Sequence, residues 1–94
     1  MTMEKKITIK NKTGLHARPA AIFVQVANKY GSEVIVRKGN LEVNGTSIMG
    51  VLMLAAGKGS QVILKVKGED AELAMLELEM VLSGEIDSAD KEKK

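Results

Sequence analysis

The stretch EVIVRKGNLEV, residues 33–43, decides which kind of fold this 94-residue chain can form. Its two arms, 33–37 and 41–43, are β-branched or alternate polar with apolar residues, a pattern typical of β-strands. The connection 38–40 contains Gly39, and short glycine-containing connections join antiparallel strands into hairpins. The sequence therefore predicts two neighbouring antiparallel strands in the middle of the chain.

Two more strands are predicted, one before this hairpin in the chain and one after it. Residues 6–10 (KITIK) alternate polar and apolar with period 2, as a strand with one buried face does. Residues 61–67 (QVILKVK) are similarly β-branched and alternating. We therefore expect a sheet of four strands.

Two long helices are predicted, one after the first strand and one after the last. The first starts near Ala17 and stops at Gly31, because apolar residues recur at three- and four-residue spacings up to a glycine. The last opens with acids at 69–70, which the helix dipole favours, and runs to about Leu82. The apolar positions are Ala20, Phe23, Val24, Ala27 and Tyr30 on the first, and Ala71, Leu73, Ala74, Met75, Leu76, Leu78, Met80, Val81 and Leu82 on the last.

A short helix is expected between the third and fourth strands. Thr46 and Ser47 precede the apolar run 48–54, and a hydroxyl before such a run signals a helix N-cap. The run is too short for its period to separate helix from strand. The glycines of 57–59 favour a short helix with a glycine at its C-terminus.

The resulting order, β-α-β-β-α-β-α, predicts an α+β fold in which helices cover one face of a mainly antiparallel sheet. Residues 1–84 are expected to form a single domain, because 94 residues suit one hydrophobic core. Residues 85–94 lack apolar periodicity, so we expect a frayed, charged tail to which we assign no function.

Composition excludes several functional classes. No apolar run approaches the roughly 20 residues of a membrane span, and the N-terminus has no secretory apolar stretch, so we expect a cytoplasmic protein without membrane insertion. The absence of cysteine and the single histidine exclude a disulfide framework, a thiolate zinc site and a multi-histidine metal cage, and no cofactor is implied. Residues 1–67 carry 11 Lys and Arg against three Glu, which favours an acidic partner.

The single histidine, His16, is the main candidate for chemistry. Pro19 is tolerated only in the first turn of a helix, which places His16 at or just before a helix N-terminus. Free backbone N–H groups there and the donors of Arg18 favour an anion. A neutral imidazole has a nucleophilic nitrogen, so the residues suit a phosphorylated histidine. An ordinary capping or loop histidine is the alternative reading.

The segment TGLHARPAA, residues 13–21, resembles the active-site signature of the HPr family, histidine-containing phosphocarriers of the bacterial phosphoenolpyruvate-dependent sugar phosphotransferase system. TSIMGV, residues 46–51, resembles the regulatory serine segment of the same family. The resemblance implies an open-faced β-sandwich with three helices on one face of an antiparallel sheet in order 1-4-2-3. It also implies that Nδ1 of His16 accepts a phosphoryl group from enzyme I for enzyme IIA domains, with Arg18 and the backbone N–H of Ala17 stabilising its charge.

The resemblance assigns further residues to regulation and docking. Ser47 would be the target of HPr kinase/phosphorylase, and its phosphorylated form would be read by a catabolite-control transcription factor in some lineages. An apolar docking patch would form on two helices, although a buried core is the alternative for each member. Its residues are Ala17, Ala21, Ile48, Met49 and Leu52. Met53, Ala55 and Ala56 depart from the family pattern, in which smaller residues or glycine are frequent.

Other functional classes fit less well. A nucleic-acid-binding module is disfavoured because Phe23 and Tyr30, the only aromatic residues, have helix spacings that suit a core. An enzyme with its own turnover lacks a complete set of catalytic groups. A paralogous carrier in a regulatory, nitrogen-type phosphotransferase chain remains the alternative to sugar uptake. The protein is expected to be a monomer.

Overall fold

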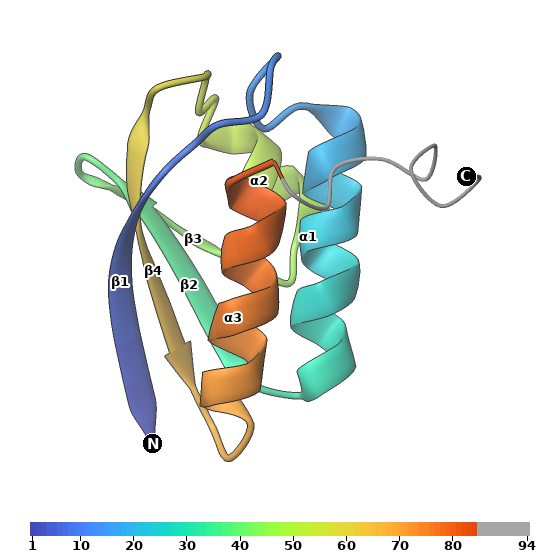
Figure 1. The fold of residues 1–94 in the computed structure, drawn as a ribbon, viewed down its shortest axis with the longest axis vertical. Helices are drawn as coiled ribbons and strands as arrows, with labels where there is room; N and C mark the ends of the chain where they lie inside the picture. The colour runs from blue at the N-terminus through green and yellow to red at the C-terminus, as the bar shows by residue number, and fades with distance from the viewer. Residues whose placement is uncertain (85–94) are drawn as a thin grey trace.

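The computed structural model describes residues 1–84 and has two layers, a sheet with helices packed on one of its faces (Figure 1). Neighbouring strands are antiparallel, in the order β1-β4-β2-β3. The predicted α+β sandwich is therefore confirmed, whereas the predicted tail, 85–94, lies outside the described residues. In chain order the elements are β1 (Thr2–Thr8), α1 (Ala17–Tyr30), β2 (Glu33–Lys38), β3 (Leu41–Asn44), α2 (Ile48–Met53), β4 (Gln61–Lys67) and α3 (Ala71–Leu82).

The hydrophobic core lies between the sheet and the helices. Alternate residues of the central strands face the helices and are buried, as the period-2 pattern requires. They belong to one cluster with Phe23 of α1 and Leu78 of α3. The α1 stripe differs slightly from expectation: Val24 and Tyr30 are only half-buried, whereas Val26, which the pattern did not single out, is buried.

The first strand is longer at its start than predicted. Sequence alternation indicated 6–10, but β1 pairs with β4 from Thr2 opposite Lys67 to Thr8 opposite Gln61. Ile9 continues the pairing through its N–H to Ser60 O at 2.8 Å, and Lys10 turns away to bond Leu82 O at 3.0 Å. The start of the strand was missed because residues 4–6 are all charged and exposed, so they do not alternate polar with apolar.

The prediction that a glycine ends the short helix is wrong. Helix α2 ends at Met53, and the residue in the left-handed conformation after it is Ala55, with φ +49°. Gly59, which is also left-handed, comes later in the turn. By contrast, Gly31 has φ +67° and ends α1 as expected.

Helix α3 is apolar on more than one face. Six of its apolar residues are buried against the sheet and α1, but Leu73 and Leu76 are 59% and 60% exposed. Glu77 of α3 joins this helix to α1 through a polar cluster. The Tyr30 hydroxyl donates to Glu77 Oε1 at 2.5 Å, and Lys29 Nζ lies 2.9 Å from the same oxygen.

Candidate functional site

His16 occupies the N-cap of α1. Its carbonyl accepts the first helical hydrogen bond, from Ala20 N at 2.9 Å, while its exposed side chain makes no capping bond. Pro19, buried in the first turn, brings no N–H of its own. The prediction of a histidine at the helix start is confirmed, and His16 lines a hollow together with Ala17, at the end of α1 where the helix dipole is positive.

The loop before His16 is held at two places. Leu15 N donates to Ala56 O at 2.8 Å, which seats the loop on the turn after α2. Gly14 has φ +78° and touches the same turn, since a β-carbon on it would lie only 2.7 Å from Ala56 O. At the other end, Asn11 Nδ2 donates to Val81 O of α3 at 3.2 Å. The loop that carries the imidazole is therefore bonded to the rest of the fold at both of its ends.

Asn11 is a residue that sequence reasoning missed. It is only 3% exposed, and its Oδ1 has no hydrogen-bond partner among the described residues. It lies three positions before Gly14, whose N–H donates to the Asn11 carbonyl at 3.0 Å. Nothing near Asn11 in the sequence indicates that it is buried, because the residue it bonds, Val81, is 70 positions away in the chain.

A shallow hollow beside His16 is lined by cationic and polar groups. Lys12, Arg18 and the start of α1 border it, and the described residues on its rim include no carboxylate. Such a surface favours an anion. The structure thus brings together His16, Ala17 and Arg18, as the sequence predicted.

A second, more apolar hollow also includes His16 in its lining. Leu52, Ala55 and Ala56 line it together with Leu15. Leu52 of α2 and the turn that follows this helix therefore form one wall of the His16 site.

Ser47 is the N-cap of α2. Its Oγ accepts from Gly50 N at 3.1 Å, which confirms the predicted cap. Thr46 is engaged elsewhere, because its hydroxyl and its N–H both donate to Asn44 Oδ1, at 2.7 and 2.9 Å. Ser47 as a whole is only partly buried.

The expected apolar patch is at the surface rather than in the core. Ile48 and Met49 are 40% and 65% exposed, Ala17 is exposed, and Leu52 and Ala21 are half-buried. Met53, named above only as a departure from the family pattern, is 63% exposed on the same helix. These side chains are therefore accessible to a partner.

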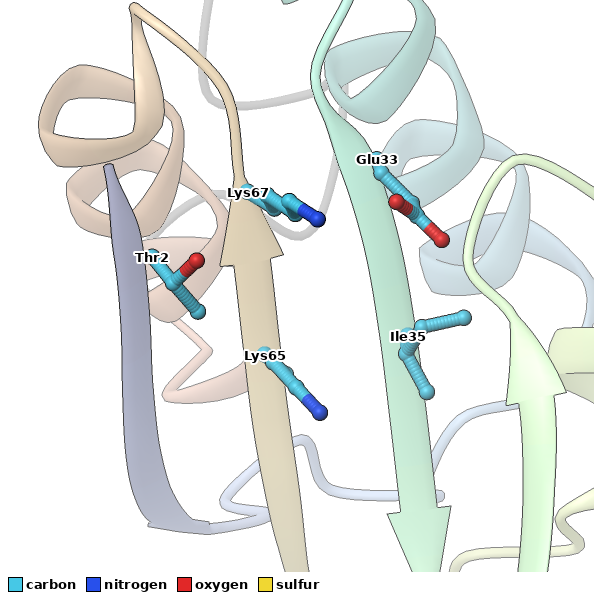
Figure 2. A pocket seen from close by; sticks show the side chains of 5 residues that line it. All are labelled: Thr2, Glu33, Ile35, Lys65 and Lys67. Carbon is cyan, nitrogen blue, oxygen red and sulfur yellow. The ribbon is translucent and has the colours of Figure 1, made fainter.

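The uncovered face of the sheet has a hollow of its own, away from His16. Figure 2 shows Lys67 extending toward Glu33, with Lys65 and Thr2 nearby and Ile35 beneath. Carboxylates and ammonium groups are mixed across neighbouring strands, so this face has no single sign of charge. It contains none of the residues predicted to be functional.

Perturbed ionisation belongs to the cluster between α1 and α3. The hydrogen bond from Tyr30, followed by that from Lys29, lowers the pKa of the Glu77 carboxyl. The same bonds to Glu77 raise the pKa of Tyr30 and of Lys29. Within residues 1–84, no group of three or more His, Asp or Glu side chains could hold a metal ion. None of the helices described is both long and apolar enough to cross a membrane.

Comparison with known proteins identifies relatives of this chain. A family model described as "PTS HPr component phosphorylation site" matches residues 3–83. The HPr-like protein Crh of Halalkalibacterium halodurans is 49% identical over 73 residues, which is 78% of this chain and 87% of the relative. A phosphocarrier protein HPr from Bacillus anthracis shares the fold with a TM-score of 0.83 and 40% identity, over 86% of this chain and 96% of that one. Crh of Bacillus subtilis, described as an intertwined dimer with a swapped domain, matches with a TM-score of 0.72 and 43% identity, over 87% and 94% of the two chains.

Proposed function

Because the chain belongs to the HPr family of phosphocarrier proteins, we propose that Nδ1 of His16 accepts a phosphoryl group from phosphorylated enzyme I and passes it to enzyme IIA domains of sugar permeases. The observation that carries the proposal is the exposed imidazole at the N-cap of α1, beside a hollow bordered by Lys12 and Arg18. The chain acts in this scheme as a covalent carrier in the cytoplasm, without turnover of its own.

The chemistry needs few groups. The Nδ1 lone pair attacks phosphorus, the new N–P bond forms as the bond to the donor breaks, and the donor leaves with the electron pair. The phosphoryl group adds negative charge next to the Ala17 N–H, the α1 dipole and Arg18, each of which stabilises an anion. Attack by the acceptor reverses the process.

The test is phosphorylation by phosphoenolpyruvate and purified enzyme I. His16→Ala is expected to take up no acid-labile phosphate, and Arg18→Ala is expected to slow transfer. Arg37→Ala is the matched control, because Arg37 lies on β2, bonds Gly39 O at 3.1 Å and lines neither of the hollows beside His16. Acid-labile phosphate retained on the His16 variant would reject the proposal.

Ser47 is proposed as the regulatory site. Phosphorylation by HPr kinase/phosphorylase would add negative charge at the start of α2, which the helix end tolerates, and the charge would repel an acidic enzyme I. A catabolite-control transcription factor is a partner for this form, in keeping with the name of the Bacillus subtilis relative, "catabolite repression containing protein". Mass spectrometry after incubation with kinase and ATP tests the site, with Ser47→Ala as the control.

A panel of acceptors distinguishes sugar uptake from the regulatory, nitrogen-type alternative. Purified protein phosphorylated on His16 is mixed with sugar-specific and regulatory enzyme IIA domains, and transfer to each is timed. Preference for sugar-specific domains supports the proposal. The same preparation, run on size-exclusion chromatography with light scattering, tests the proposed monomer against the dimer described for Bacillus subtilis Crh.

A further inference from the structure

The turn that follows α2 contains a strained residue. Ala55, with φ +49°, is the one non-glycine residue among residues 1–84 that adopts a positive φ. A β-carbon disfavours this conformation, which glycine adopts without penalty. Leu54 N and Ala55 N bond back to Val51 O and Leu52 O, at 3.2 and 3.0 Å, so the last turn is tight. Something beyond local preference must stabilise it.

Lys38, the last residue of β2, contacts this turn. Its half-buried side chain places Nζ 3.3 Å from Leu54 O and 3.4 Å from Ala55 O. These carbonyls belong to the peptide groups on either side of the Ala55 α-carbon. Their relative orientation depends on the Ala55 backbone angles, so an ammonium that binds both selects the left-handed state. A cation is also favoured at a helix C-terminus, where carbonyls lack partners.

The same turn supports the His16 loop. The next carbonyl along, Ala56 O, accepts the Leu15 N–H at 2.8 Å, and both residues are buried. Ala55 itself lines the apolar hollow beside His16. A change in the Ala55 backbone would rotate the following peptide and displace this acceptor.

We propose that Lys38 is a positioning residue of the phosphoryl site: by bridging Leu54 O and Ala55 O it maintains the left-handed Ala55, and through Ala56 it holds Leu15 and His16. The role in transfer rests on the proposed function, but the mechanical link does not. It follows that Lys38 matters only while residue 55 has a β-carbon.

A double-mutant cycle tests that dependence, with Lys38→Met, Ala55→Gly and their combination. The first readout is hydrogen exchange of the Leu15 amide, measured by NMR with the core amides Phe23 and Leu64 as reference. Lys38→Met is expected to speed Leu15 exchange about tenfold, in line with the loss of charge-assisted hydrogen bonds, without the same change at the reference amides. Lys38→Arg is expected to restore slow exchange, and Lys65→Met, on the uncovered sheet face, is the matched lysine control.

In the Ala55→Gly background, Lys38→Met is expected to change Leu15 exchange less than about twofold, because glycine needs no stabilisation there. An equal effect of Lys38→Met in both backgrounds would overturn the proposal, as would equal acceleration at Phe23 and Leu64. The second readout is the rate of phosphoryl transfer from enzyme I, expected to fall in Lys38→Met and recover in Lys38→Arg. If the unmodified protein accepts no phosphate, the proposed function fails, whereas the exchange result still decides the role of Lys38.

Discussion

The backbone N–H of Leu15 donates to the carbonyl oxygen of Ala56 at 2.8 Å, so the residue before His16 is bonded to the turn that ends α2. The loop that presents His16 is therefore in contact with the turn that follows the helix capped by Ser47. Ser47 lies at one end of α2, and Leu52, near the other end, lines the same hollow as His16. A partner that covers the imidazole will also meet α2.

Gly14→Ala is expected to damage this contact. A methyl group there would lie 2.7 Å from Ala56 O and 2.8 Å from Gly57 Cα, at φ +78°. Backbone strain and overpacking together predict a loss of about 2–4 kcal/mol in the free energy of unfolding, measured by urea denaturation. Gly39→Ala is the control: its φ is +61° but nothing lies within 4 Å, so about 1 kcal/mol is expected. Equal losses at the two positions would show that the contact with Ala56 is unimportant.

Ser47→Ala is expected to lower stability by about 1 kcal/mol, because Gly50 N loses its acceptor. Thermal unfolding should show a fall of about 4–8 °C for a domain of this size. Ser47→Asp keeps a capping oxygen and adds charge at the helix start, so its stability should stay close to that of the unmodified protein. An unchanged midpoint for Ser47→Ala would contradict the capping role.

Local patterns were sufficient for much of the fold and for the centre of the site. The hairpin of β2 and β3 follows from alternation and Gly39, and the place of His16 follows from Pro19, since each depends on neighbours in the chain. Ala55 and Asn11 could not be predicted. Ala55 is left-handed in contact with Lys38, and Asn11 is buried through Val81, so both depend on contacts made only after folding.

Exposed apolar side chains on α2 and on α3 are predicted to differ in their importance for partner binding. Met49 of α2 is 65% exposed and Leu73 of α3 is 59% exposed, so the two side chains are matched in accessibility. If partners dock around His16, Met49→Ala should weaken enzyme I binding about tenfold, as loss of a central contact does, whereas Leu73→Ala should have little effect. Isothermal titration calorimetry measures both. A larger loss for Leu73→Ala would move the docking surface to α3.

The contact between Tyr30 and Glu77 predicts how stability depends on pH. The pKa of Glu77 is lowered on folding, first by the Tyr30 hydroxyl and then by Lys29, so in acid the unfolded chain binds the proton more readily. Its contribution is complete above the ordinary carboxyl range near pH 4 and is lost as pH falls through the lowered value. Tyr30 and Lys29 have raised pKa values, so their contribution to stability is lost above about pH 10.

Glu77→Gln should therefore be less stable than the unmodified protein at pH 7, by a few degrees in the midpoint of thermal unfolding, and the difference should shrink toward pH 3. Tyr30→Phe removes the largest cause of the lowered Glu77 pKa, so stability should fall less steeply as the pH is lowered toward 3. Thermal unfolding at a series of pH values measures this, and a difference between Glu77→Gln and the unmodified protein that stays constant from pH 7 to pH 3 would show that the carboxylate makes no linked contribution.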